Sequence, residues 1–247
     1  MHLWTSKNYH KNDKIYRGAF HYFRNENQYA EENFDVYRDK KEQSYHYISE
    51  IVARVSTGEI LNMHVEYCLN KEFVPTYLFI EKIMGKDFAI EKYEFNPKKN
   101  QIHFEFKSNK TEDTTTDIAT APKFFITSPS AAASMLFLRS KKLDSSGKSS
   151  FNILSSQNQW EFQDFPQFKN ILIERANLTA EKINIEGQNV QAVQYKMYED
   201  IPANKSAKDP AHVKVYLSQH GGIPYMIKSE DGTKIQIKFL NDLSDKE

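Results

Sequence analysis

The sequence contains one cysteine, Cys68, among 247 residues. A single cysteine cannot form an intramolecular disulfide or a zinc site built from several cysteines. Cys68 lies in a strand-like run with Glu66, Tyr67 and Leu69, and isolated cysteines are commonly buried, so the sequence predicts an inert buried thiol. The sequence points to no metal and no cofactor.

Chain breakers and excess charge are also lacking. Glycine and proline number eight each, whereas the chain has 17 Phe and 14 Tyr. Few breakers argue against disorder, and many aromatic rings favour sheets and pockets. The 33 basic residues balance 33 acidic ones. A nucleic-acid or anionic-membrane surface needs an excess of Lys and Arg, so we expect no nucleic-acid partner.

Long hydrophobic runs are missing too. No apolar run reaches the length of a membrane span, and residues 1–14 lack the apolar core of a signal peptide. We therefore expect no transmembrane segment and a cytoplasmic location, or a periplasmic one if this chain is a mature form. The G-x-S-x-G, H-E-x-x-H and G-x-G-x-x-G signatures of common enzymes are absent from the sequence.

The residues that are present form a long series of short strand patterns. In residues 101–107, Ile102, Phe104 and Phe106 alternate with polar residues, which is typical of a strand with one wet face. We expect strands in the first half at residues 18–23, 29–38, 43–55, 60–69, 76–84 and 88–95. Those expected in the second half are residues 149–154, 160–162, 168–178, 181–186, 189–198, 213–218, 223–229 and 234–240.

Residues 129–140 break this strand pattern. Ser128 suits a helix cap, Pro129 suits the first helical position, and residues 131–138 are apolar apart from one serine. A helix that is apolar on nearly all sides must be buried. We expect it to plug a curved sheet, with the polar residues 108–120 before it and 141–148 after it as the moving parts.

These features predict a mainly β protein, with a large curved antiparallel sheet or half-open β-barrel wrapping one buried α-helix. All-β proteins of this length often form one domain. One large unit and two intimately joined β units are both compatible with this length, and we expect a single β-rich domain over residues 1–247. Its pseudo-halves would be residues 1–122 and 149–247, joined by helix 129–140.

Two short motifs resemble an uncharacterised bacterial β family. Residues 130–139, SAAASMLFLR, resemble its helix, and residues 215–220, VYLSQH, followed by Ile223 and Pro224, resemble a second run. That family has a half-open barrel similar to periplasmic lipoprotein carriers. The resemblance implies a curved antiparallel sheet around one helix, an apolar concavity and no known catalytic apparatus.

The leading functional hypothesis is a non-enzymatic binding protein that holds an apolar or amphipathic small molecule, such as a lipid, in this concavity. Aromatic residues two apart in the strands either pack in the core or line such a cavity. The residues expected to contact the ligand are Tyr77, Phe79, Phe104, Phe106, Met135 and Phe137.

An alternative hypothesis is a small-molecule isomerase or hydrolase. His64 and Glu66 share one strand face, as do His103 and Glu105, because side chains two apart point the same way. On neighbouring strands the two pairs would form a metal or acid–base cluster. The simpler interpretation is that His103 and Glu105 face water, because they lie on the face opposite Ile102, Phe104 and Phe106.

Exposed strand charge is likewise the simpler interpretation of several other polar groups, since carboxylates are common on such faces. These groups are Glu31, Glu32 and Asp35, and His46 with Glu50. A third hypothesis is a scaffold or protein-interaction module. It would dock a partner through a sheet edge at Val74 and Pro75 or through the loop 108–120.

Overall fold

The computed structural model describes residues 13–140, 146–177, 179–185, 187–199, 212–217 and 222–244. They contain sixteen β-strands and one short helix. The strands form a 16-stranded sheet in the order β8-β7-β6-β5-β4-β3-β2-β1-β16-β15-β14-β13-β11-β10-β9, with β12 paired to β13 beside this path. The protein is therefore mainly β, as the sequence predicts.

The first half is an antiparallel meander in which each strand pairs with the next. Its strands are β1 (Lys14–Arg24), β2 (Asn27–Asp39), β3 (Ser44–Arg54), β4 (Ile60–Leu69), β5 (Pro75–Met84), β6 (Asp87–Asn96), β7 (Gln101–Ser108) and β8 (Thr114–Ala119). Tight turns connect them. Gly85, between β5 and β6, has a φ of 60°, a left-handed value that glycine adopts without steric penalty.

The second half contains β9 (Phe125–Ile126), α1 (Phe137–Ser140), β10 (Lys148–Ser155), β11 (Gln167–Arg175), β12 (Glu181–Ile185), β13 (Gln188–Glu199), β14 (Val213–Leu217), β15 (Pro224–Ser229) and β16 (Thr233–Asp242). The last strand, β16, pairs with β1, which joins the two halves into one sheet. The only parallel pair among the described strands is β9 with β10.

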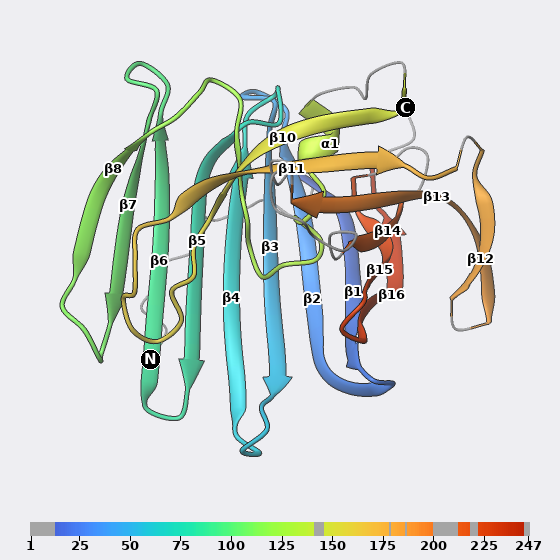
Figure 1. The fold of residues 1–247 in the computed structure, drawn as a ribbon, viewed down its shortest axis with the longest axis horizontal. Coiled ribbons are helices and arrows are strands. Elements are labelled where there is room, and N and C mark those ends of the chain that lie inside the picture. Colours follow the sequence, from blue (N-terminus) through green and yellow to red (C-terminus); the bar gives the residue numbers. More distant parts are fainter. Residues whose placement is uncertain are drawn as a thin grey trace, which may run out of the picture.

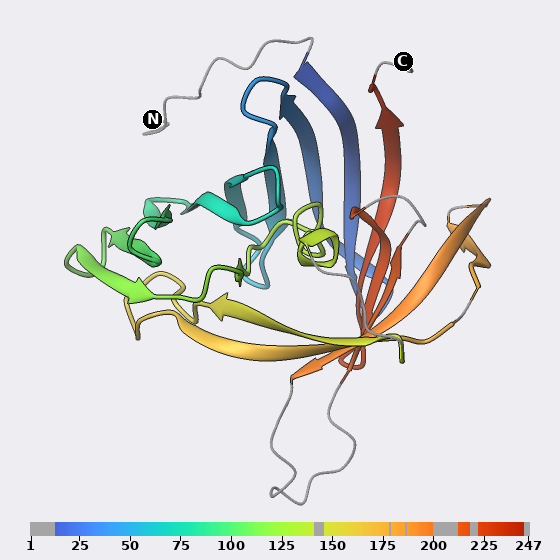
Figure 2. The same cartoon turned by 90° about the horizontal axis from the view of Figure 1, so that it is seen from above.

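The sheet is strongly curved. In Figure 1, β1 to β8 stand side by side, while β10, β11 and β13 cross them nearly at right angles. Seen from above in Figure 2, the sheet curls, and α1 lies between the β1–β3 wall and the β10–β11 wall. The expected curved antiparallel sheet is confirmed in this barrel-like form.

Two hydrophobic clusters fill the concave side. The main cluster contains fully buried aromatic residues such as Phe20, Phe104 and Phe106. The smaller cluster gathers residues of β9, β10 and β11 around Met135 and Phe137. Complete burial of a large apolar side chain stabilises a fold by roughly 1.5–3 kcal/mol relative to exposure. The apolar residues 131–137 contact both clusters and thus form the plug of this core.

The predicted helix over residues 129–140 is wrong, although its apolar residues are buried. Residues 131–136 form successive turns, and the helix covers only Phe137–Ser140. The backbone bonds are short-range, since Ser134 N donates to Ala131 O at 3.2 Å. The Ser134 hydroxyl donates to the same carbonyl at 2.8 Å. Such side-chain bonds compete with the helical pattern.

A buried carboxylate takes the place of the predicted Ser128 cap. Glu32 on β2 is fully buried, so its predicted exposure is wrong. Its oxygens accept the Ala131 amide hydrogen at 2.8 Å and the Tyr22 hydroxyl hydrogen at 2.5 Å. Burial and the Glu32 charge raise the pKa of Tyr22 well above its usual value. Glu32 therefore anchors the start of the plug to the sheet.

Other local predictions also change. Residues 108–120, expected to be a loop, contain strand β8. Residues 160–162, expected to be a strand, are not part of any strand. Pro75 does not lie at a sheet edge, because β5 lies between β4 and β6. It opens β5 beside a register shift at Cys68, where proline is tolerated. Residues 141–145 and 200–210 lie outside the described residues.

Candidate ligand-binding site

An inner cavity of about 590 Å³ lies on the concave face. β4 and β5 contribute much of its wall, and residues 55–57, 59, 127–129, 156 and 158–160 also line it. Its apolar lining includes Leu61, Met63, Ile80, Met84 and Trp160. The four strand residues among them point to the same face, because side chains two apart along a strand share a face, and Lys82 lies between Ile80 and Met84 on β5.

The inner cavity also has a small polar group of residues. Lys82 Nζ lies 3.3 Å from Glu91 Oε1 and donates a hydrogen bond to the Asn158 carbonyl at 3.2 Å. The Tyr93 hydroxyl donates to Glu91 Oε2 at 2.7 Å. Burial and the Glu91 charge raise the pKa of Tyr93 well above its usual value, so this phenol stays protonated.

Lys82 and Ser128 have hydrogen-bonding capacity left for a ligand. The side chains of Lys82 and Glu91 are only 12% and 4% exposed. An ammonium group has three hydrogens, and Glu91 and Asn158 engage two of those on Lys82. The Ser128 hydroxyl is buried and has no hydrogen-bond partner within the described part of the chain. Both residues line the inner cavity.

A second cavity of about 320 Å³ lies on the other side of residues 127–128, which line both spaces. Its walls are largely apolar and include Phe125, Phe137, Ile153 and Ile171. A third hollow, of about 780 Å³, shares Leu61, Met63 and Pro129 with the inner cavity. The concave face is thus hollowed on both sides of the chain that leads into the plug.

The structure separates the six residues expected to contact a ligand. Phe137 lines the second cavity, and Tyr77 lines a hollow on the outer face of the sheet. Phe104 and Phe106 are fully buried in the main core, and Met135 is buried in the smaller cluster. Phe79 is buried on the outer face, where its ring lies 6.2 Å from that of His64.

The four residues of the enzyme hypothesis do not come together. His64 and Glu66 lie on β4 and His103 and Glu105 on β7, with β5 and β6 between the two strands. Neighbouring strands are roughly 4.8 Å apart, so the pairs are separated by roughly 14 Å. Each histidine has its own acidic neighbour: His64 lies 2.5 Å from Glu50, and His103 lies 2.8 Å from Asp117.

Lys82 and Glu91 were missed at the sequence level. In β5 the inward side chains alternate from Leu78 through Ile80 to Lys82, so a charged residue interrupts an apolar face. That interruption is the signal of a buried polar group. The signal is hard to detect because Phe79 makes the outward face of β5 apolar as well, so the sequence does not show which face points inward.

No protein-family model matches the sequence, and the comparison with curated proteins gives no match. The fold is similar to a beta-barrel-like protein of a domain of unknown function, DUF1849, from Brucella abortus, with a TM-score of 0.57 and 7% identity. That match covers 92% of this chain and 97% of the other. At such low identity the likeness concerns the fold alone.

A second solved structure, a DUF1089 family protein from Pseudomonas aeruginosa, matches with a TM-score of 0.47 and 10% identity, covering 80% of this chain and 88% of that one. The arrangement of the strands and the DUF1849 match together define the class, a mainly β protein with a barrel-like fold. Among the described residues, the longest helix falls far short of what is needed to cross a bilayer.

Proposed function

We propose that the protein is a non-enzymatic binding protein for an apolar or amphipathic small molecule of lipid type. The observation that carries the proposal is the inner cavity on the concave face. Its volume of about 590 Å³ falls within the roughly 300–1,000 Å³ typical of small-molecule sites. Such sites combine an apolar wall with a few convergent polar groups.

The lining fits a ligand with an apolar body and a polar end. Met63, Ile80 and Trp160 offer contact area to the body. The Lys82 ammonium and the Ser128 hydroxyl offer hydrogen bonds to the polar end. Lys82 pairs with Glu91, and Glu59 also lines the cavity, so the lining carries one more carboxylate than ammonium group, which favours a neutral head group.

The direct test measures lipid binding to the parent protein and to a variant in which a larger side chain fills the inner cavity. Protein purified from cells would be examined by native mass spectrometry, then delipidated and mixed with a long-chain fatty acid or a neutral glycolipid. Binding only to the folded state, at a free ligand concentration 100 times Kd, stabilises it by about 2.7 kcal/mol. We expect a corresponding rise in Tm.

A matched pair of variants locates the site. Met84→Trp places a large ring in the inner cavity, which Met84 lines without lining the other two spaces on the concave face, and we expect it to abolish the rise in Tm. Val52→Trp makes a comparable increase in size on β3, where Val52 is 48% exposed, and should leave the rise intact. The proposal fails if delipidated protein gains no stability from any of these lipids, or if both variants bind as the parent does.

A further inference from the structure

The outer face of the sheet holds a second, chemically different group of residues. His46 on β3 lies directly opposite Cys68 on β4 in the antiparallel register, and Glu66 precedes Cys68 by two residues on the same face. All three are buried, with 8%, 4% and 5% exposure for His46, Glu66 and Cys68. The predicted exposure of His46 is therefore wrong, whereas the predicted burial of Cys68 is confirmed.

Their donor atoms converge on one point. His46 Nδ1 lies 3.1 Å from Cys68 Sγ, and Cys68 Sγ lies 3.8 Å from Glu66 Oε1. One ligand atom from each residue lies within 4.8 Å of the other two. Tetrahedral zinc with bonds of roughly 2.0–2.3 Å sets its ligand atoms roughly 3.5 Å apart, which these separations bracket.

The other nitrogen of His46 is also positioned as a metal site requires. Nε2 lies 3.0 Å from the Ser44 hydroxyl, which can accept its hydrogen. Metal-binding histidines usually donate their second ring N–H in this way, which fixes the tautomer and the ring orientation. With Nε2 protonated, the lone pair of Nδ1 points to Cys68.

We propose that His46, Glu66 and Cys68 bind a divalent transition-metal ion of the zinc class. Thiolate and imidazole ligands favour such ions over magnesium or calcium, which prefer oxygen ligands alone. An outer hollow of about 560 Å³ opens beside the three ligands and leaves room for a fourth ligand such as water. The site lies on the opposite face from the inner cavity and does not depend on the proposed lipid binding.

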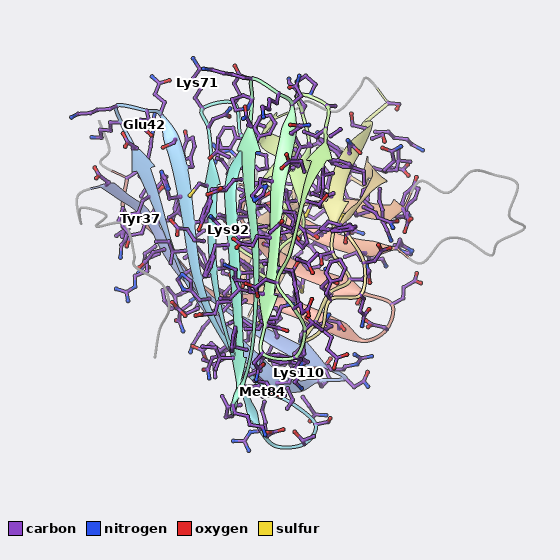
Figure 3. The ribbon with its side chains drawn as sticks, turned by 90° about the vertical axis from the view of Figure 1, so that its left-hand side faces the viewer. Tyr37, Glu42, Lys71, Met84, Lys92 and Lys110 are labelled. Atoms are coloured by element: carbon purple, nitrogen blue, oxygen red, sulfur yellow. The ribbon has the colours of Figure 1, made fainter. Side chains whose placement is uncertain are left out.

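The charge around the outer hollow favours a cation. Glu42, Glu66 and Glu94 line it, together with a single lysine, Lys92, which lies 3.0 Å from Glu94. Figure 3 labels Glu42 and Lys92, which mark its position on the sheet. The carboxylates outnumber the lysine, so a bound dication would offset local negative charge.

Cobalt(II) provides the test, since Cys68 is the only cysteine in the chain. The full chain, stripped of metal with a chelator, would be titrated with cobalt(II) alone. We expect a thiolate-to-cobalt charge-transfer band that saturates at one ion per chain and disappears when zinc is added. Any such band must arise from Cys68. Absence of the band, or cobalt binding without it, would overturn the proposal.

Variants then identify the other ligands. We expect Cys68→Ser to remove the band, and His46→Gln and Glu66→Gln each to weaken binding at least about 10-fold. His103→Gln, which removes an exposed histidine beside Asp117, is the matched control and should bind as the parent does. Circular dichroism checks that each variant folds. If one of the two ligand variants does not fold, the other carries the test, and unchanged cobalt affinity in a folded ligand variant contradicts the assignment.

Discussion

The carboxylate of Glu32 accepts a hydrogen bond of 2.6 Å from the hydroxyl of Ser130, which lies 98 residues later in the chain. Ser130 is in turn 2.8 Å from the hydroxyl of Ser49 on β3. These bonds attach the start of the plug to two neighbouring strands. They fix the position from which residues 127–129 divide the concave face into its cavities.

Replacing Glu32 should therefore destabilise the protein. Glu32→Gln presents amide hydrogens to groups that are themselves donors, and breaking a buried charged network costs about 2–4 kcal/mol. Glu31→Gln is the matched control on the opposite face. Glu31 is 34% exposed and pairs with Lys238 at 3.3 Å, so its loss should cost under about 1 kcal/mol. Urea denaturation measures both values, and equal losses would contradict the anchoring role.

Removing Lys82 should expose the dependence of Glu91 on its partner. Lys82→Met leaves a buried carboxylate without its ion pair, for which we expect a loss of about 3–5 kcal/mol in unfolding free energy. In the double variant Lys82→Met with Glu91→Gln, the uncompensated charge is gone and Tyr93 keeps an acceptor. Part of the stability should return. A double variant as unstable as the sum of both single variants would argue against this pairing.

Tyr67 holds the short strand β9 in place. Its hydroxyl donates to the Ile126 carbonyl at 3.0 Å and accepts the Ile126 amide hydrogen at 3.1 Å. Tyr67→Phe removes both bonds and leaves two buried backbone groups unsatisfied, which should cost about 2–3 kcal/mol. Tyr29→Phe, at a partly exposed position, should change stability by less than about 0.5 kcal/mol. Chemical denaturation of both variants measures the two losses in unfolding free energy, and equal losses would contradict the role of Tyr67.

Alkaline pH should weaken the fold. Burial raises the pKa of Tyr22, Tyr47, Tyr67 and Tyr93. In the unfolded chain these phenols titrate near pH 10, so above that pH the native state binds more protons than the unfolded one. Their stabilising contribution is complete below about pH 10 and is lost as the pH rises toward the raised values.

Each such tyrosine adds up to about 1.4 kcal/mol per pH unit to the fall in stability. Urea denaturation between pH 9 and about pH 11 measures this slope. Tyr67→Phe should reduce the slope by the share of one tyrosine. An unchanged slope in that variant would show that Tyr67 is not the group that titrates.

Much of the sheet follows from local pattern. The prediction for residues 60–69 coincides with β4, and Ile102, Phe104 and Phe106 on β7 point inward as their alternation predicts. The alternation of inward and outward side chains depends on adjacent residues of one strand, so it does not depend on which strand is the neighbour. It fails on β16, where an extra residue opposite β1 shifts the register and leaves Phe239 39% exposed.

The sites could be predicted much less well. Phe104 and Phe106 were expected to contact a ligand, yet they pack in the core. The sequence pattern of an inward-facing aromatic residue is the same whether that residue lines a cavity or fills the core. Glu32 and His46 were expected on exposed faces. Whether a polar strand residue meets water depends on what covers that part of the sheet, and a strand pattern does not contain this information.

The sequence by itself determined that this is a mainly β protein with an apolar segment buried in its core, because periodicity and burial of apolar residues act over a few neighbouring residues. Only the tertiary structure decided which polar groups meet. Glu32 reaches Ser130, Lys82 reaches Glu91, and His46 reaches Cys68 through strand register and sheet curvature. Those relationships arise between distant residues, and they determine where a ligand or a metal ion can bind.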